Sequence, residues 1–313
     1  MSNVYRFLLL KFYIILNIIN CIQTLPNGYL LGASYNPVSG SNAIFKINPL
    51  DGKFAVLTPL TSYKAYDVTY DFIHKVLYVF GSQASSENEA ELSVMVINPL
   101  NGTQKYRPIT LEPDADIFNL SVDSSTEMLY SVQIDDSPEN PISIVQIDTR
   151  EFIAKRWVNI TGADGIRADC MAVFFNASVH QYFGAVLFED VYIVGIDVPK
   201  QKIISNVTNT NLPSYLCYDN KTDAFYGMQK AQRERGCSLV RLNPYNGSMD
   251  VISKYFDDYL PSSGDCYNGY YFTMIVKGFD DQNIVTFDLS DNAKVIANIR
   301  VKSYLNAFAF APN

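Results

Sequence analysis

Short apolar runs separated by polar turns form the main pattern along this chain. The runs 65–71, 75–81, 92–97 and 104–111 are rich in Val, Leu, Ile, Tyr and Phe, and polar or Gly-containing segments divide them. Such runs are typical of strands joined by hairpin turns. No segment keeps a 3.6-residue apolar period over the length of a helix. We therefore expect an all-β chain built from four-stranded antiparallel sheets.

The same unit returns along the sequence. Ile47-Asn48-Pro49-Leu50-Asp51-Gly52 recurs almost unchanged from Ile97 and from Leu242, and weaker copies begin at Ile147, Ile196 and Phe287. In each copy the segment is the turn between the third and fourth strands, and in the three close copies Gly supplies a positive φ. Units spaced by 45 to 50 residues predict a stacked or radial repeat rather than one irregular core.

The first unit lacks one strand. Residues 28–33, 42–47 and 53–58 supply only its second, third and fourth strands, whereas residues 304–310 match the first strands of the other units. A ring explains both facts, because the C-terminal strand then completes the N-terminal sheet and leaves no free edge. We therefore predict a six-bladed β-propeller closed by its C-terminal strand.

The chain resembles the six-bladed propellers of the YVTN, NHL and YWTD-like group. The resemblance covers residues 28–313 and rests on the order of the units and on second strands of the Leu77-Tyr78-Val79 type. The chain has one Trp, no Gly-Gly pair and no Tyr-Trp-Thr-Asp segment, so it departs from the kelch and tryptophan–aspartate signatures. The resemblance implies a fold and no particular partner or reaction.

The N-terminal 24 residues predict a secretory leader, followed by a single propeller domain over residues 25–313. Arg6 precedes a mostly apolar stretch, Phe7 to Ile22, and Gln23-Thr24 can precede a cleavage site. The alternative is an uncleaved membrane anchor, for which this stretch is short and Lys11 interrupts it. No later stretch is apolar and long enough to span a membrane, so we expect a secreted protein or one tethered at its N-terminus.

Glycosylation sequons support the secretory pathway. Asn119 falls inside an expected innermost strand, beside the channel, and we predict that it is not glycosylated. The other six sequons are predicted to carry sugar: Asn101, Asn159, Asn176, Asn206, Asn220 and Asn246.

Four cysteines follow the leader, an even number that predicts up to two disulfides in an oxidising compartment. Three pairings are open, and the alternative is four buried thiols: Cys170, Cys217, Cys237 and Cys266. No Cys-x-x-Cys motif is present, so a zinc or redox motif is unsupported.

Charge and histidine content narrow the chemistry. The net charge is −8 and no basic cluster occurs, which argues against nucleic acid. The two histidines, His74 and His180, fall in turns between first and second strands, where a solvated role is expected. No Gly-x-Ser-x-Gly elbow and no clustered zinc ligands are present.

Carboxylates at or near the starts of innermost strands are the remaining candidates for chemistry. In a ring such positions converge at one mouth of the central channel, where oxygen ligands suit Ca²⁺ or acid–base work. The alternative is that they only solvate the mouth and cap turns, and we predict no other cofactor. The candidate channel-mouth residues are Asp67, Asp116, Arg167, Asp169 and Asp265.

Sequons and loops divide between two faces. The first-to-second and third-to-fourth turns share one face, here called the turn face, and the second-to-third loops lie on the other, the loop face. The loop face carries no sequon, and its loops are long and charged; in the fifth blade they include Arg233 and Arg235. Because binding residues often lie on loops of a rigid scaffold, we expect this face to bind an extracellular protein or glycan. The alternative is that the loops are only solvated.

The sequence thus favours a secreted, glycosylated binding module without catalysis. The alternative from another class is a propeller hydrolase of the lactonase kind with a metal in the channel. A structural role in an extracellular coat is the third hypothesis.

Overall fold

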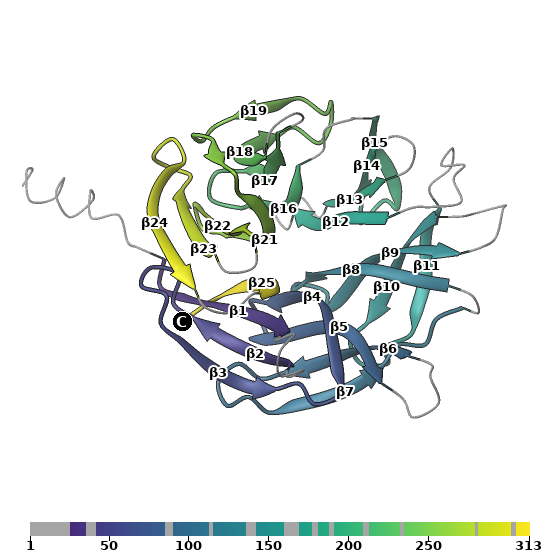
Figure 1. Ribbon diagram of the computed structural model, residues 1–313. Helices are drawn as coiled ribbons and strands as arrows, with labels where there is room; N and C mark the ends of the chain where they lie inside the picture. Colours follow the sequence, from purple (N-terminus) through teal and green to yellow (C-terminus); the bar gives the residue numbers. More distant parts are fainter. Residues whose placement is uncertain are drawn as a thin grey trace, which may run out of the picture.

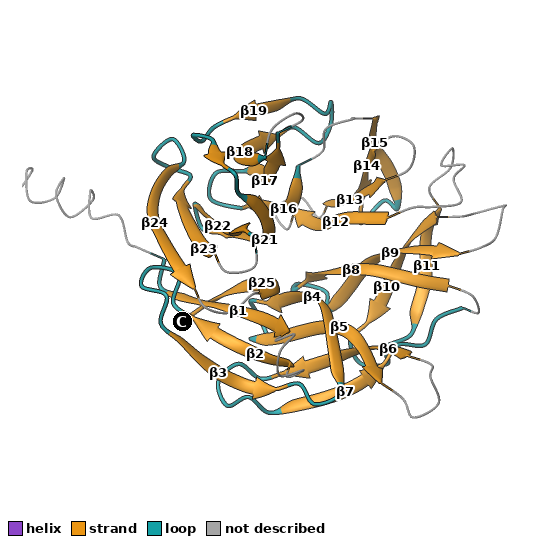
Figure 2. Ribbon diagram, viewed as in Figure 1, coloured by secondary structure: helices purple, strands orange, loops and turns teal. Residues whose placement is uncertain are grey.

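The computed structural model describes residues 26–35, 42–84, 90–112, 115–135, 142–159, 169–176, 181–187, 191–208, 213–231, 235–278, 281–301 and 305–313. Within these ranges every regular element is a strand, and the strands form six small antiparallel sheets arranged as blades around one axis (Figures 1 and 2). The predicted all-β, six-bladed propeller is confirmed.

The strands follow the chain blade by blade, with the innermost strand first in blades 2 to 6. Blade 1 contains β1 (Gly28–Tyr35), β2 (Asn42–Ile47), β3 (Phe54–Pro59) and the C-terminal β25 (Leu305–Pro312). Blade 2 contains β4 (Tyr63–Asp71), β5 (Val76–Ala84), β6 (Ala90–Ile97) and β7 (Gln104–Pro108). Blade 3 contains β8 (Ala115–Asp123), β9 (Met128–Asp135), β10 (Ile142–Asp148) and β11 (Ala154–Asn159).

The second half of the ring repeats this plan with one variation. Blade 4 contains β12 (Asp169–Asn176), β13 (Gln181–Leu187), β14 (Val191–Asp197) and β15 (Lys202–Thr208). Blade 5 contains β16 (Ser214–Asp219), β17 (Ala224–Lys230), β18 (Gly236–Leu242), a short β19 (Met249–Val251) and an additional β20 (Phe256–Asp257), which also pairs with β18. Blade 6 contains β21 (Leu260–Tyr267), β22 (Tyr270–Lys277), β23 (Asp281–Asp288) and β24 (Lys294–Val301).

The C-terminal strand closes the ring. β25 pairs antiparallel with β1, with Leu30 opposite Phe310 and Gly32 opposite Phe308, and Figure 1 shows the yellow end of the chain beside the purple beginning. Phe310 is fully buried and stacks on Phe272 of blade 6, with ring centroids 4.7 Å apart. The predicted closure is confirmed, and it joins the two ends of the chain by a hydrogen-bonded ladder.

Apolar packing is divided among the interfaces between blades. The described residues form six buried clusters, and each cluster combines side chains of two neighbouring blades. Each blade therefore buries both of its faces only when it has a neighbour on either side. The innermost strands contact one another around the whole axis, in the order β25, β4, β8, β12, β16, β21 and back to β25.

The innermost strands share a feature that the sequence did not reveal. Each one is paired to its second strand with a break in register that marks a β-bulge, as between Ala65 and Asp67 in β4 and between Pro261 and Ser263 in β21. A bulge bends the strand and redirects its side chains. β21 begins at Leu260, although Pro261, Ser262 and Gly264 near its start do not follow an apolar strand pattern.

The repeated Asn-Pro turns attach neighbouring blades. In the first copy the Asn48 side-chain oxygen accepts a hydrogen bond from the Leu50 amide, and Gly52 has a φ of 69°. The Pro49 carbonyl accepts a hydrogen bond from the Thr286 hydroxyl of blade 6, at 3.0 Å. The Pro244 carbonyl of blade 5 accepts one from Ser205 of blade 4 in the same way, at 2.7 Å. The motif is therefore repeated because it serves both as a turn and as a contact between blades.

The stack at the closing strand predicts a large cost for losing Phe310. Removing a fully buried Phe ring costs about 3–5 kcal/mol, so we expect Phe310→Ala to lower the unfolding free energy by this amount in urea titrations. Phe54→Ala is the control, because Phe54 lies in the outermost strand of the same blade and is half exposed. Equal losses for the two variants would contradict a special role of the closing strand.

Two glycines with similar positive φ values distinguish the cost of left-handed backbone strain from the cost of a steric clash. Gly102 and Gly278 have φ values of 71° and 69°. A Cβ at Gly102 would lie 2.5 Å from the Leu57 carbonyl oxygen of blade 1, whereas nothing lies within 4 Å at Gly278. We expect Gly278→Ala to cost about 1–2 kcal/mol from the left-handed backbone alone and Gly102→Ala to cost clearly more. Urea titration of both variants measures the difference.

Candidate functional site

Two carboxylates from the sequence-predicted set lie in the wall around the propeller axis. Asp67 follows the bulge of β4. Its Oδ1 accepts a hydrogen bond from the Val68 amide at 2.8 Å, and its Oδ2 accepts one from the Leu120 amide of blade 3, also at 2.8 Å. Asp67 therefore ties the innermost strand of blade 2 to that of blade 3.

Asp265 makes the corresponding tie between blades 6 and 1. Its Oδ1 accepts a hydrogen bond from the Cys266 amide at 2.8 Å, and its Oδ2 accepts one from the Phe310 amide of β25 at 2.7 Å. The nearby Ser263 hydroxyl oxygen accepts a further hydrogen bond from the Phe308 amide at 3.1 Å. The last blade is therefore fastened to the closing strand by side chains as well as by apolar packing.

The surroundings of both carboxylates favour the neutral acid. Burial raises the pKa of Asp67 to about 6 and that of Asp265 to about 7, although the amide hydrogen bonds oppose these shifts. The charge of Asp67 raises the pKa of Asp265 further, so the two groups interact across the axis. Both residues keep some solvent exposure, and protons can exchange with water at this wall.

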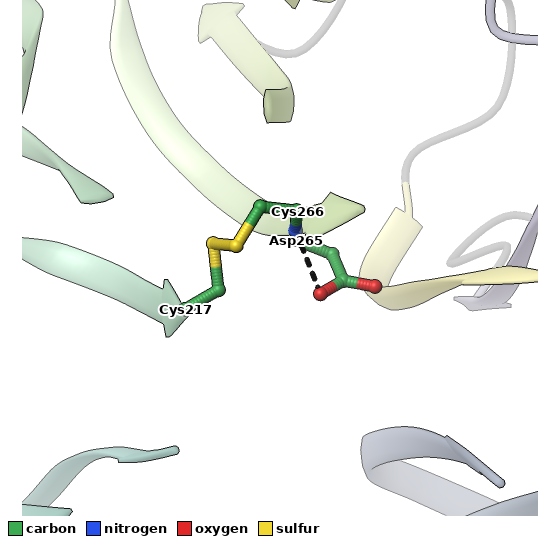
Figure 3. A group of neighbouring side chains, drawn as sticks. All are labelled: Cys217, Asp265 and Cys266. Atoms are coloured by element: carbon green, nitrogen blue, oxygen red, sulfur yellow. Dashed lines mark hydrogen bonds between the residues drawn. A yellow bond between two sulfur atoms is a disulfide. The ribbon is translucent and has the colours of Figure 1, made fainter. Parts of the chain in front are cut away.

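A disulfide lies beside Asp265. Cys217 in β16 is bonded to Cys266 in β21, and both sulfur atoms lie within 4.8 Å of a carboxylate oxygen of Asp265 (Figure 3). Metal ions bind cysteine as the thiolate, and neither sulfur of a disulfide is one. The three residues are therefore no metal site while the disulfide is intact.

The structure contains one of the cysteine pairings that the sequence left open, Cys217 with Cys266. Cys237 is a buried free thiol, so a second disulfide between Cys237 and Cys170 is not formed, and the side chain of Cys170 lies outside the described residues. Burial raises the pKa of the Cys237 thiol to about 12, which keeps it protonated.

The structure does not place the other predicted channel-mouth residues beside Asp67 and Asp265. Asp116 is exposed near the start of β8, three residues before the bulge of that strand, whereas Asp67 follows the bulge of β4. The two carboxylates therefore lie at different levels along the axis. Arg167 and the side chain of Asp169 lie outside the described residues. On the loop face, Arg235 is exposed just before β18, and Arg233 also lies outside them.

One charged cluster on the turn face was not predicted. The Nδ1 of His74 lies 2.8 Å from Asp71, and its Nε2 lies 3.0 Å from Glu127 in the next blade. The hydrogen bond with Asp71 raises the pKa of His74 most, and the charges of Asp71 and Glu127 raise it further. Glu127 is far from His74 in sequence but occupies the equivalent turn one unit later, which is the signal that could have revealed the pair. His74 is exposed in its turn, as expected, and it also contacts two carboxylates; His180 lies outside the described residues.

A row of stacked aromatic rings joins blades 2, 6 and 1 near the turn face. Phe72 of blade 2 stacks on Tyr267 of blade 6, which stacks in turn on Phe310 of the closing strand, with centroid separations of 5.2 and 5.0 Å. Phe72 remains partly exposed, and the adjoining Ile73 is largely exposed. The sequence gave no sign of this contact, because blades 2 and 6 are not neighbours in the chain.

Most sequon asparagines lie at exposed positions of the described chain. Asn101 and Asn246 are in third-to-fourth turns, Asn220 is in a first-to-second turn, and Asn159 and Asn206 are in outermost strands. The Asn101 side-chain oxygen accepts hydrogen bonds from the Thr103 amide and hydroxyl. The side chains of Asn119 and Asn176 lie outside the described residues.

Comparison with known proteins supports the fold and goes no further. No protein-family model matches this chain, and no curated protein matches it. Three similar structures are a chain of the nidogen/laminin complex, TolB from Acinetobacter baumannii and a putative 6-phosphogluconolactonase from Bacteroides fragilis. Their TM-scores are 0.63, 0.65 and 0.51, and their identities are 12%, 11% and 13%. They cover 90%, 91% and 90% of this chain and 98%, 67% and 83% of their own.

At these identities the likeness shows the β-propeller fold alone, and such a fold hosts unrelated functions. Within the described ranges no helix has the length and apolar character needed to cross a membrane. The predicted leader, residues 1–24, lies outside those ranges.

The raised pKa values of the two axis carboxylates predict a pH-dependent stability. The ordinary pKa of both groups is 3.8, so between about pH 4 and about pH 7 the native state binds more protons than the unfolded chain. The unfolding free energy should therefore fall as the pH rises through this window, and His74, whose pKa is also raised, acts in the same direction.

Urea titrations across this pH range measure the slope. The double variant Asp67→Ala/Asp265→Ala should be less stable at every pH but should show a flatter slope. Ser263→Ala is the control, because Ser263 binds the closing strand in the same way without a titrating group. An unchanged slope in the double variant would disprove the assignment.

Proposed function

We propose that this chain is a secreted, glycosylated propeller that binds an extracellular protein or glycan through its loop face and performs no catalysis. The observation that carries the proposal is the position of the sequons. The five whose side chains the structure describes are exposed. Asn101, Asn220 and Asn246 lie on the turn face and Asn206 lies within the outermost strand β15, so sugars at these four would leave the loop face open; Asn159 ends the outermost strand β11 opposite Ser143, at the loop-face end of blade 3.

The state of the axis carboxylates supports a structural role for them. Asp67 and Asp265 each accept two main-chain hydrogen bonds, and each links two blades. A carboxylate committed in this way has fewer lone pairs for a substrate or a metal ion. The likeness to a chain of the nidogen/laminin complex adds support, because that chain was solved in a complex of two proteins.

A hydrolase with a metal ion at the axis is the alternative function. One observation favours it: the pKa of Asp265 is raised to about 7, a value suited to proton transfer at neutral pH. The likeness to a putative 6-phosphogluconolactonase points in the same direction.

The loop face is proposed as the binding surface on its charge and on the scaffold beneath it. The second-to-third loops, residues 36–41, 85–89, 136–141, 188–190, 232–234 and 279–280, lie outside the described residues, and the strands that carry them are firmly paired. Arg235 is exposed at the edge of this face. A partner attracted by Arg233 and Arg235 would present acidic groups, such as carboxylates or a sulfated glycan.

The test combines secretion, glycan mapping and charge reversal. We expect the full chain, expressed in a eukaryotic secretory host, to appear in the medium with sugar at the six predicted sequons and none at Asn119. Immobilised Arg233→Glu/Arg235→Glu protein should capture its extracellular partner at least about tenfold more weakly than wild type, a loss of about 1.4 kcal/mol. Lys53→Glu/Lys221→Glu is the control, since both lysines are exposed on the turn face.

Equal capture by the two double variants would contradict the loop-face assignment, and sugar on the second-to-third loops would do the same. Stoichiometric Ca²⁺ in the purified protein, together with hydrolysis of a lactone that Asp265→Asn abolishes, would favour the enzyme instead.

A further inference from the structure

The pairing of a disulfide with an acid at the axis has no counterpart elsewhere in the described chain. Both sulfur atoms of Cys217–Cys266 and a carboxylate oxygen of Asp265 lie within 4.8 Å of one another (Figure 3). We propose that Cys217–Cys266 is an exchangeable disulfide, that Asp265 is the proton donor for its opening, and that its reactant is a small dithiol. This proposal does not depend on the binding function proposed above.

The chemistry of opening needs a proton at the place where Asp265 lies. A thiolate of the reactant attacks one sulfur of the disulfide, the S–S bond breaks, and its electron pair leaves on the other sulfur. A proton from the Asp265 carboxyl turns this leaving thiolate into a thiol. The second thiol of the reactant then attacks the mixed disulfide. The products are two cysteine thiols and the cyclic disulfide of the reactant, which has supplied two electrons and two protons; Asp265 regains its proton from water.

The protonation of Asp265 is suited to this role. Its pKa of about 7 leaves a large neutral fraction near neutral pH. The titratable groups around it are Asp67 from β4 and the hydroxyl of Tyr271 from β22, and Tyr271 in turn faces Tyr215 and Cys237. Within the described part of the chain no cation is among these groups, so only the amide hydrogen bonds from Cys266 and Phe310 stabilise the charged carboxylate. Above its pKa, Asp265 has no proton to donate, and its negative charge would repel an approaching thiolate. For both reasons the disulfide would open more slowly.

The disulfide is buried beside two partly exposed residues. Cys217 and Cys266 are 7% and 5% exposed, whereas the adjoining Asp265 and Tyr215 keep partial solvent exposure. The interface of blades 5 and 6 does not rest on the disulfide alone. The Tyr271 hydroxyl donates a hydrogen bond to the Tyr215 carbonyl at 2.9 Å, and a buried apolar cluster spans both blades. Reduction of the disulfide therefore removes the covalent link between β16 and β21, while blades 5 and 6 remain packed.

The test is native-state reduction of the full-length oxidised protein. Dithiothreitol is the probe, free thiols are alkylated at set times, and mass spectrometry follows Cys217 and Cys266. Rates are divided by the thiolate concentration at each pH. For wild type we expect this normalised rate to fall by at least about tenfold between about pH 6 and about pH 8.5, in line with general-acid assistance. For Asp265→Asn we expect a flat profile across the same range.

Asp67→Asn is the matched control. Asp67 is also a partly buried axis carboxylate that accepts two amide hydrogen bonds, and it belongs to no such cluster with sulfur. We expect its variant to keep the wild-type profile, displaced slightly to lower pH because its charge no longer raises the pKa of Asp265. Folding of each variant is checked by circular dichroism and urea titration.

The shape of the pH profile, rather than the absolute rate, decides the outcome, since either substitution can loosen the wall and speed reduction at every pH. A wild-type profile in Asp265→Asn would overturn the proposal. Equal flattening in Asp67→Asn, or a disulfide that resists dithiothreitol until the protein is unfolded, would overturn it as well.

Discussion

The antiparallel ladder between β1 and β25 is the constraint on which the rest of the ring depends. Every buried cluster of the described chain spans two blades, so no blade has an apolar core of its own. An open ring would expose the apolar faces of both terminal blades and leave the unpaired edge of β1 in solvent. Because the ladder joins the first and last strands, the stability of every interface between blades depends on β1 and β25 remaining paired.

Around the axis, polar side chains add hydrogen bonds to the interfaces between blades that the apolar clusters stabilise. Asp67 links blades 2 and 3, Asp265 links blades 6 and 1, and the disulfide of Cys217 links blades 5 and 6. These ties work because the bulges redirect the innermost strands, so that a side chain of one strand reaches an amide of the next. Burial of these carboxylates raises their pKa values and so favours the neutral form.

The two faces of the ring are built by different means. On the turn face, short turns are held by side chains of Asn and Asp, and ionic contacts such as that of His74 with Glu127 join adjacent blades. Sequons on the same face and on the rim fit a surface that solvent or sugar covers. The second-to-third loops of the loop face carry charged residues in several blades, including Arg233 and Arg235 in the fifth. A rigid scaffold with one variable face suits recognition, and this is why binding is favoured over catalysis in the proposed function.

The sequence by itself determined the number of blades, the order of strands within a blade and the closure, because each of these follows from local periodicity. The period near 50 residues, the Gly52, Gly102 and Gly247 turns and the missing first strand are properties of neighbouring residues, and local hydrogen bonding and backbone conformation enforce them.

Only the tertiary structure decided which residues meet at the axis. The bulges shift the register by one residue, and such a shift determines whether Asp67 and Asp116 lie at the same level. The pairing of Cys217 with Cys266, the stack of Phe72 on Tyr267 and the bridge from His74 to Glu127 all join different blades. Such contacts depend on how the blades are placed around the axis, and no local pattern in the chain encodes that placement.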